Sequence, residues 1–326
     1  MRIHVQNDPH DRPFGITPEQ WQAAAARAPD VGQDHVVSYG RTPEEFAAAL
    51  AEAEILVIAV SELAGRFPMA APRLKVIFCT SAGVDKLAPF DWLPPGVALL
   101  NNRGVHAAKA GEFGIMAVLM LAARMPELIA AQRAERWQKL HSGSVRGRRL
   151  TVVGLGSLGG AAATQAAHFG IAVTGVRTRP SPHPACTRVI AVDDLDSVLP
   201  DSEFLLLACP LTEATRNLMD RRRLSLLPEG AGVVNIGRGP LLDQEAICDL
   251  LDAGKLGGAV LDVFTPEPVP PGHRLWTTKN LVMTPHVSAD DVATYNPLSL
   301  DLLFINLRAM KEGKPLPNQV DPQRGY

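Results

Sequence analysis

A glycine-rich turn is the sequence feature that most constrains how this chain can fold. The segment Val153-Gly154-Leu155-Gly156-Ser157-Leu158-Gly159 has the pattern G-x-G-x-x-G, follows an apolar run typical of a strand and opens a stretch with helical periodicity. Gly154 allows a tight turn, Gly156 lets a pyrophosphate approach the backbone, and Gly159 permits close packing of helix on strand. We expect a dinucleotide site in which the N–H groups of Ser157 and Leu158 face the phosphates. A plain glycine turn is the alternative.

The chain on both sides of this turn alternates short apolar runs with helical patterns, which indicates a mostly parallel sheet covered by helices. A sheet of this kind suits a dinucleotide-binding domain. Six strands are expected in it: Leu150-Val153, Ala172-Val176, Phe204-Ala208, Gly232-Ile236, Ala259-Asp262 and Leu281-Met283.

The first hundred residues carry a second α/β pattern. Thr17-Pro18-Glu19-Gln20 and Thr42-Pro43-Glu44-Glu45 each supply a capping hydroxyl, a proline at the first helical position and Glu or Gln at the third, so helices should begin there. Five strands are expected around these helices: Ile3-Gln6, His35-Tyr39, Ile55-Val60, Leu74-Thr80 and Val97-Asn101.

The length of 326 residues favours two domains, at roughly 150 residues each. An apolar helix over about Val105-Ala123 and a polar link over 141–149 precede the glycine turn, and a helix over Asp291-Met310 is long enough to return to the first domain. We therefore expect a discontinuous substrate domain of residues 1–102 and 292–326 and a cofactor domain of residues 103–291. The expected class is α/β, with two doubly wound parallel-sheet domains, the Rossmann-type cofactor domain inserted in a flavodoxin-like substrate domain.

Composition excludes several kinds of partner. The net charge is only -2, with 46% hydrophobic and 20% charged residues, so nucleic-acid binding has little electrostatic support. The polar N-terminus and the shortness of the apolar runs predict no signal peptide and no membrane span, hence a cytoplasmic protein. The cysteines lie far apart without metal-ligand spacing, so we expect buried thiols and no metal; they are Cys79, Cys186, Cys209 and Cys248.

The end of the second strand of the cofactor domain bears on which nicotinamide cofactor is used. An NAD-binding protein normally places Asp or Glu there to hold the ribose 2′-hydroxyl. This chain has Arg177-Thr178-Arg179 instead. Because a guanidinium can pair with a 2′-phosphate that a carboxylate would repel, we predict NADP(H), with NAD possible if both arginines are only surface residues.

Three polar residues follow strands of the cofactor domain, where open α/β sheets place their ligands. They are Arg238, Glu267 and His286. Hydride delivery to a ketone leaves an alkoxide that histidine can protonate, and a nearby carboxylate favours the imidazolium form. Arg238 could bridge the carbonyl oxygen and carboxylate of a 2-keto acid. Taken singly, each has a structural alternative, such as a solvated loop residue.

The order of the motifs resembles that of the D-isomer-specific 2-hydroxyacid dehydrogenase family over nearly the whole chain. Beyond the glycine turn, the resemblance rests on Pro210-Leu211-Thr212, Asn235-Ile236-Gly237-Arg238-Gly239, Leu261-Asp262-Val263-Phe264 and Thr284-Pro285-His286. It implies that Arg238, Glu267 and His286 are the catalytic set, with Arg238 and His286 also touching substrate. It also implies that Asp262 contacts the nicotinamide end of the cofactor, with further contacts from Cys209, Pro210, Thr215, Ile236 and Gly237.

The same resemblance implies the substrate class and the assembly. NADP-preferring reductases of this kind make glyoxylate and hydroxypyruvate the default substrates and the D-2-hydroxy acid the product. A homodimer through the apolar helix that follows Val105 is likewise expected from the family. The excess of apolar residues in that helix is compatible with this assembly.

In the first domain, Thr80-Ser81-Ala82-Gly83-Val84-Asp85 follows a strand and resembles the family's substrate loop. Small residues expose backbone N–H groups, so Ala82, Gly83 and Val84 are expected to bind the substrate carboxylate. The sequence departs from the family at Lys109, in the helix after the domain crossing, where either a substrate contact or a solvated side chain is possible.

Two other functions are compatible with the fold. A non-catalytic dinucleotide-sensing regulator would share the glycine turn, but the complete Arg238, Glu267 and His286 set argues against a purely binding role. A related enzyme acting on formate would have Gln at the position of Glu267. The sequence therefore favours an NAD(P)-dependent oxidoreductase that reduces a small 2-keto acid.

Overall fold

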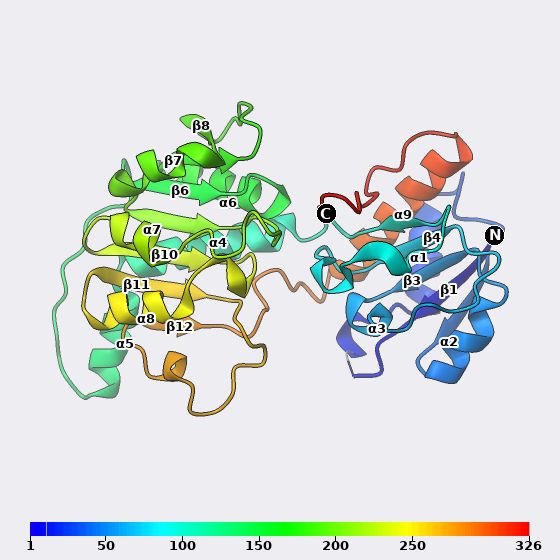
Figure 1. Cartoon of the computed structure of the whole chain (residues 1–326), viewed down its shortest axis with the longest axis horizontal. Coiled ribbons are helices and arrows are strands. Elements are labelled where there is room, and N and C mark those ends of the chain that lie inside the picture. Colours follow the sequence, from blue (N-terminus) through cyan, green and yellow to red (C-terminus); the bar gives the residue numbers. More distant parts are fainter. Residues whose placement is uncertain (11, 326) are drawn as a thin grey trace. The chain divides into compact units, whose positions relative to one another are not determined.

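The computed structural model describes residues 1–10 and 12–325 of the chain. They form two compact units, Met1–His106 with Asp291–Tyr326, and Ala107–Asp290. Each unit contains its own parallel sheet with helices around it (Figure 1). The expected fold class, α/β with two parallel-sheet domains, is confirmed.

The sheet of the first unit has the strand order β2-β1-β3-β4-β5, which is the flavodoxin-like order. All of its pairings are parallel, so the carboxyl ends of the strands lie along one edge. Strand β2 lies on one side of β1, and β3, β4 and β5 follow on the other side. The topological switch point therefore lies between β1 and β3. The strands are β1 (Arg2–Gln6), β2 (Val36–Gly40), β3 (Ile55–Ile58), β4 (Val76–Cys79) and β5 (Ala98–Leu100).

Helices α1 (Pro18–Arg27) and α2 (Pro43–Leu50) begin at the two predicted capping boxes. The Thr17 hydroxyl accepts from the Gln20 N–H at 3.3 Å, and the Gln20 side chain accepts from the Thr17 N–H at 3.0 Å. Thr42 and Glu45 repeat this arrangement. The reciprocal bonds satisfy backbone donors that the first helical turn would otherwise leave unpaired. The short helix α3 (Val60–Leu63) follows β3.

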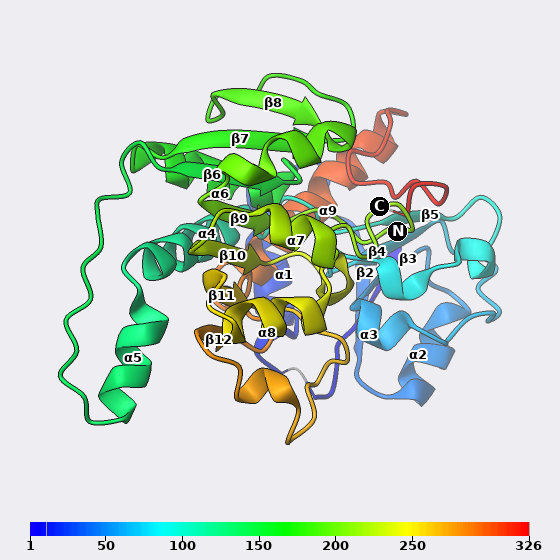
Figure 2. The same ribbon diagram turned by 60° about the vertical axis from the view of Figure 1, so that its left-hand side comes forward.

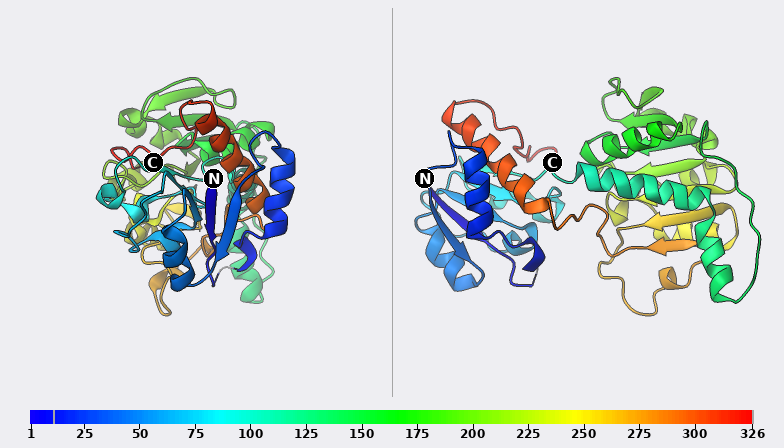
Figure 3. Two further views of the ribbon diagram at one scale, coloured as in Figure 1. Left: turned by 90° about the vertical axis from the view of Figure 1, so that its right-hand side faces the viewer. Right: turned by 180° about the vertical axis from the view of Figure 1, so that it is seen from behind.

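Helix α9 (Tyr295–Lys311) belongs to the first unit and packs against α1 (Figure 3). The rings of Trp21 and Phe304 meet edge to face at 5.2 Å, in a core shared by the two helices. The predicted start at Asp291 is wrong by one turn. The Asp291 carboxylate instead accepts from the hydroxyl of Thr294 at 2.7 Å, and this local turn delays the helix.

The sheet of the second unit has seven strands rather than the six predicted, in the order β12-β11-β10-β9-β6-β7-β8. The unpredicted strand is β8 (Arg188–Ala191), a four-residue edge strand without a fully buried residue, which therefore lacks a strong apolar signal. The others are β6 (Arg149–Val153), β7 (Ala172–Arg177), β9 (Phe204–Leu207), β10 (Ala231–Asn235), β11 (Leu256–Leu261) and β12 (Leu281–Met283).

The helix predicted over about Val105–Ala123 is present, and a second helix that was not predicted follows it. Helix α4 (Ala107–Ala122) ends before Arg124, whose φ of 56° is left-handed, and α5 (Met125–Arg133) continues at a bend of 65°. A long irregular segment then leads to β6 (Figure 2). Across residues 1–10 and 12–325, no single helix is long and apolar enough to cross a membrane, and α4 and α5 reach that length only as a bent pair.

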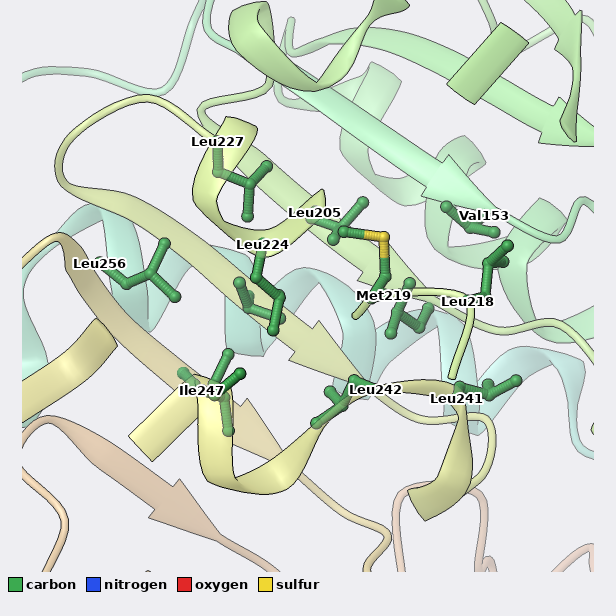
Figure 4. Packing of buried hydrophobic residues seen from close by; sticks show 14 of the residues in the cluster. Val153, Leu205, Leu218, Met219, Leu224, Leu227, Leu241, Leu242, Ile247 and Leu256 are labelled. Carbon is green, nitrogen blue, oxygen red and sulfur yellow. The ribbon is translucent and has the colours of Figure 1, made fainter. Parts of the chain in front are cut away.

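Buried hydrophobic side chains cover both faces of the sheet in the second unit. On one face the sheet packs against α4 and α6 (Ser157–His168). On the other, side chains from α7 (Arg221–Leu226) and α8 (Gln244–Asp252) pack against the strands (Figure 4). Leu205, Leu224 and Ile247 are all 0% exposed there. At about 1.5–3 kcal/mol for each fully buried side chain, this packing makes the sheet a rigid base for the loops at its carboxyl edge.

Candidate active site

The three residues predicted to be catalytic follow three neighbouring strands. Arg238 follows β10, Glu267 follows β11 and His286 follows β12, and these strands pair in parallel in the order β12-β11-β10. Because parallel strands end at one edge of a sheet, the loops that carry these residues leave the sheet side by side. The fold thereby brings together residues that lie up to 48 positions apart in the sequence (286 minus 238).

His286 and Glu267 form a direct pair. Nδ1 of His286 lies 3.0 Å from Oε2 of Glu267, and the other carboxylate oxygen accepts from the Phe264 N–H at 2.7 Å. A carboxylate only accepts, so Nδ1 carries the hydrogen. The His286 side chain is 47% exposed and that of Glu267 28%. The imidazole is therefore oriented by its partner while its Nε2 remains available to a ligand.

Asp262 holds the turn that carries His286. Its side chain accepts from the Thr284 hydroxyl at 2.6 Å and from the N–H groups of Val287 and Ser288 at 2.9 and 3.0 Å. Asp262 is 0% exposed, so all of these bonds form out of water. His286 itself has a φ of 57°, a left-handed conformation that surrounding contacts must maintain. The observed contacts of this carboxylate thus position the histidine; a contact with nicotinamide stays a prediction.

The loop of Arg238 is fixed by the buried Asn235 side chain. Asn235 accepts from the Gly237 N–H at 3.0 Å and donates to the Arg238 carbonyl at 2.9 Å. A Cβ on Gly239 would lie 2.3 Å from the backbone of Phe264, so only glycine permits this approach of the β10 and β11 loops. The partly buried Arg238 guanidinium donates to the Gly237 carbonyl at 2.8 Å.

The glycine turn has the geometry that a dinucleotide requires. Gly154 has a φ of 95°, and a Cβ on it would lie 2.6 Å from the Cys209 backbone nitrogen. A Cβ on Gly159 would lie 1.9 Å from the Gly154 carbonyl, whereas one on Gly156 would meet nothing within 4 Å. Gly156 is also the N-cap residue of α6, and no side-chain hydrogen bond caps the start of this helix. Open space therefore lies at a helix N-terminus that offers its backbone donors, a cradle that fits a pyrophosphate.

This cradle lies at the switch point of the second sheet. β6 pairs with β9 on one side and β7 on the other, so Cys209 and Pro210 flank the turn on one side and Arg177 on the other. Burial raises the pKa of the Cys209 thiol to about 11, which keeps it neutral beside the turn. The Thr215 hydroxyl donates to the Pro210 carbonyl at 2.8 Å and so holds this loop.

Arg177 ends β7 and donates to the Ser181 hydroxyl at 2.7 Å. Sequence reasoning did not identify Ser181, because a serine four residues along a loop carries no motif of its own. Thr178 and Arg179 are exposed. The guanidinium is thus held at the end of the strand where selection at the ribose 2′-position takes place in this kind of domain.

The predicted substrate loop lies in the first unit, after β4. Ala82 and Gly83 are partly exposed and Val84 is buried. The preceding Ser81 accepts from the Val60 N–H at 3.3 Å, which ties this loop to the start of α3. In the part of the chain that the structure describes, no group of three or more His, Cys, Asp or Glu side chains could hold a metal ion.

Comparison with known proteins identifies the family. The model of the D-isomer specific 2-hydroxyacid dehydrogenase NAD-binding domain matches residues 115–288. Glyoxylate/hydroxypyruvate reductase A of Arabidopsis thaliana is 32% identical over 248 residues, covering 75% of this chain and 78% of the relative. Glyoxylate/hydroxypyruvate reductase B of Yersinia pestis is 30% identical over 283 residues, or 84% and 86% of the two chains.

Solved structures similar to this chain support the same family. A D-isomer specific 2-hydroxyacid dehydrogenase of Xanthobacter autotrophicus in complex with NADPH superposes with a TM-score of 0.83 at 29% identity, covering 99% of both chains. An NADPH-dependent glyoxylate/hydroxypyruvate reductase of Sinorhizobium meliloti in complex with NADP has a TM-score of 0.82 at 26% identity, covering 100% and 99%. The chain belongs to the D-isomer specific 2-hydroxyacid dehydrogenase family and is an NAD(P)-dependent oxidoreductase.

Proposed function

We propose that this protein uses NADPH to reduce glyoxylate to the achiral glycolate and hydroxypyruvate to a D-2-hydroxy acid. The observation that carries the proposal is the Glu267–His286 pair, which stands beside the Arg238 loop at one edge of a dinucleotide-binding sheet. The named substrates of the relatives from Arabidopsis thaliana and Yersinia pestis support the choice of acids. When bound, the reduced nicotinamide supplies the hydride.

His286 donates the proton that the reduced carbonyl oxygen requires. Its Nδ1–H is engaged by Glu267 at 3.0 Å, so Nε2 is the atom that delivers the proton. The carboxylate stabilises the positively charged ring before transfer and fixes its orientation during transfer. In the direction of oxidation the same Nε2 accepts the hydroxyl proton.

Arg238 binds the anionic substrate and stabilises the oxygen on which negative charge develops. A guanidinium presents two parallel N–H groups to a carboxylate, which also orients the 2-keto group. The backbone N–H groups of Ala82, Gly83 and Val84 provide further donors for the carboxylate. Substrate recognition therefore uses neutral backbone donors together with one permanent positive charge.

Arg177 selects the phosphorylated cofactor. Its guanidinium follows β7 and is held by the Ser181 hydroxyl at 2.7 Å, and no acidic residue stands at the end of this strand. Thr178 and Arg179 supply adjacent donors to the 2′-phosphate. The NADPH and NADP bound by the two similar structures support this preference. NADH remains a weaker substrate.

Two copies of the chain form a dimer through α4 and α5. Ile115, Met116, Leu119 and Met125 line an apolar hollow of about 460 Å³ on these helices. Met116 is 42% exposed and Met125 37%, which is a high exposure for neighbouring large apolar side chains. Burial against a second copy removes this surface from water.

The compartment is the cytoplasm. Cys79, Cys209 and Cys248 are buried free thiols, and burial raises the pKa of Cys79 to about 12. Reduced cysteines that serve as apolar core residues are typical of a reducing compartment. The partner there is a small 2-keto acid rather than nucleic acid or membrane.

A substrate panel tests the proposed reaction. Steady-state reduction of glyoxylate, hydroxypyruvate, pyruvate and oxaloacetate is measured with NADPH and with NADH, and product stereochemistry is determined by chiral chromatography. We expect the highest kcat/KM for glyoxylate or hydroxypyruvate with NADPH, and a D product from hydroxypyruvate. NADPH binding without reduction of any acid would instead identify a dinucleotide-sensing regulator.

A further inference from the structure

The first unit contains a polar pocket of about 110 Å³ at the switch point of its sheet. It opens at the carboxyl ends of β1, β3 and β4, which are neighbours in the strand order. Ligands bind at such switch points in open α/β sheets. Its polar lining includes Asn7, Asp8, Ser61, Thr80, Ser81 and Tyr295.

Hydrogen bonds hold the walls of this pocket in place. The Asn7 side chain is 8% exposed; it donates to the Ile16 carbonyl at 3.0 Å and accepts from the Ile16 N–H at 2.8 Å. The Tyr295 hydroxyl donates to the Thr80 carbonyl at 2.5 Å, and its ring lies 4.7 Å from that of Phe14. The pocket is therefore formed before a ligand arrives.

Hydroxyl and carboxylate groups face one another across the pocket. The Ser61 hydroxyl donates to Oδ2 of Asp8 at 3.3 Å, a long bond, while Oδ1 accepts from the His10 N–H at 2.8 Å. The Thr80 backbone groups are hydrogen-bonded, but within residues 1–10 and 12–325 its hydroxyl has no hydrogen-bond partner. Asp8 and Thr80 can thus accept from, and donate to, a ligand hydroxyl.

The pocket adjoins the proposed carboxylate-binding loop. Thr80 and Ser81 line the pocket, and Ala82, Gly83 and Val84 follow them directly in the chain. Ser81 and Ala82 are consecutive, and neighbouring Cα atoms are about 3.8 Å apart, so the pocket wall and the first expected carboxylate donor lie side by side. A small acid whose carboxylate binds at Ala82 to Val84 has its substituent within reach of the pocket.

We propose that this pocket binds the hydroxyl-bearing substituent of the 2-keto acid, so that a hydroxymethyl group is preferred to a methyl group. The assignment deepens the proposed reductase function and rests on it. A methyl group would desolvate Asp8 and Thr80 without replacing their hydrogen bonds to water, so the acid that lacks the hydroxyl is disfavoured. The Asp8 carboxylate also repels a second carboxylate, which excludes dicarboxylic keto acids.

The test compares kcat/KM for hydroxypyruvate, pyruvate and glyoxylate with NADPH in the native protein and in two variants, Asp8→Asn and Thr80→Val. Glyoxylate lacks the substituent and serves as the internal reference. We expect the native protein to prefer hydroxypyruvate to pyruvate by about tenfold or more, and each variant to lower the hydroxypyruvate-to-glyoxylate ratio about fivefold to tenfold.

Asp34→Asn is the matched control. Asp34 is exposed and precedes β2, so it lies at the amino ends of the strands, whereas the pocket lies at their carboxyl ends. It makes the same chemical change and should leave the ratio unaltered. A ratio in Asp8→Asn and Thr80→Val equal to that of the control, with glyoxylate still reduced, would overturn the pocket assignment alone. Absence of turnover with all three acids would overturn the proposed function and the pocket assignment with it.

Discussion

The N–H of His286 donates to the main-chain carbonyl of Asp262 at 2.8 Å, and the Asp262 side chain holds the residues on either side of this histidine. The proton-donating imidazole is therefore positioned from two directions. Glu267 orients the ring, and Asp262 fixes the backbone that carries it.

Asp262→Asn should disrupt this turn. Both carboxylate oxygens accept hydrogen bonds, so an amide nitrogen in place of either oxygen faces donors such as the Ser288 N–H. Because Asp262 is fully buried, the loss should lower the free energy of unfolding by about 2–4 kcal/mol and reduce kcat. Chemical denaturation and steady-state kinetics measure the two effects. Normal stability with lost cofactor binding would instead assign the carboxylate to nicotinamide.

His286→Ala should lower kcat by about 10² to 10⁴-fold, the range for removal of a general acid, while NADPH still binds. Glu267→Gln keeps the size of its side chain but removes the charge, so we expect a smaller loss of kcat than in His286→Ala. Fluorescence titration with NADPH is the control measurement. If His286→Ala abolishes both binding and turnover, the histidine has a structural role.

Arg177→Asp should move cofactor preference from NADPH toward NADH. The substitution removes a partner of the 2′-phosphate and adds a charge that repels it, which is worth at least about tenfold in the ratio of kcat/KM values. Arg188 provides the control. It begins β8 and so lies at the amino ends of the parallel strands, whereas Arg177 lies at the carboxyl end of β7. An equal change of preference in Arg177→Asp and Arg188→Asp would remove Arg177 from this role.

Met116→Lys tests the proposed dimer. A lysine in this apolar interface must be desolvated, which costs several kcal/mol; Glu112, four residues earlier in the wall of the hollow, offsets only part of that cost. We expect sedimentation velocity to show monomers for this variant and dimers for the native protein. Ile305→Lys is the matched control, since Ile305 is 46% exposed on α9, in the other unit. A monomeric native protein would exclude the proposal.

Local signals in the sequence were sufficient for most of the fold. The two capping boxes and the glycine turn work within a few residues, so their structures follow from composition and spacing alone. Strand β8 was not predicted because its side chains are only partly buried. The end of the apolar helix near Ala123 was predicted, but helix α5 was not, because only Pro126 and Ala131 are buried in it and its apolar periodicity is weak.

The active site likewise has features that the sequence predicted and features that only the folded chain shows. Arg238, Glu267 and His286 could be named from the sequence because each follows an apolar run in a glycine- or proline-marked turn. The positioning role of Asp262 depends on donors 22 to 26 residues away, which only the folded chain brings together. The pocket beside Asp8 depends on the parallel pairing of β1 with β3, which β2 separates in the chain, and of β3 with β4.

His4 should make the stability of the first unit depend on pH. This side chain is 2% exposed, and burial lowers the pKa of the imidazole below its ordinary value of 6.5. Its ring nitrogens contact the Ser38 hydroxyl at 2.9 Å and the Gln6 side-chain oxygen at 3.0 Å. The hydrogen bond to Gln6 and the charge of Glu45 partly oppose the effect of burial on this pKa, since both favour the protonated ring.

The sign of the effect follows from proton binding. As the pH falls through 6.5, the unfolded chain takes up a proton that the folded chain still excludes, so stability decreases until the pH reaches the lowered pKa of folded His4. His4→Gln should therefore lose less stability than the native protein between pH 7.5 and pH 5.5, as measured by Tm. His10→Gln, at an exposed position, should behave like the native protein. An unchanged pH dependence in His4→Gln would show that other groups determine acid stability.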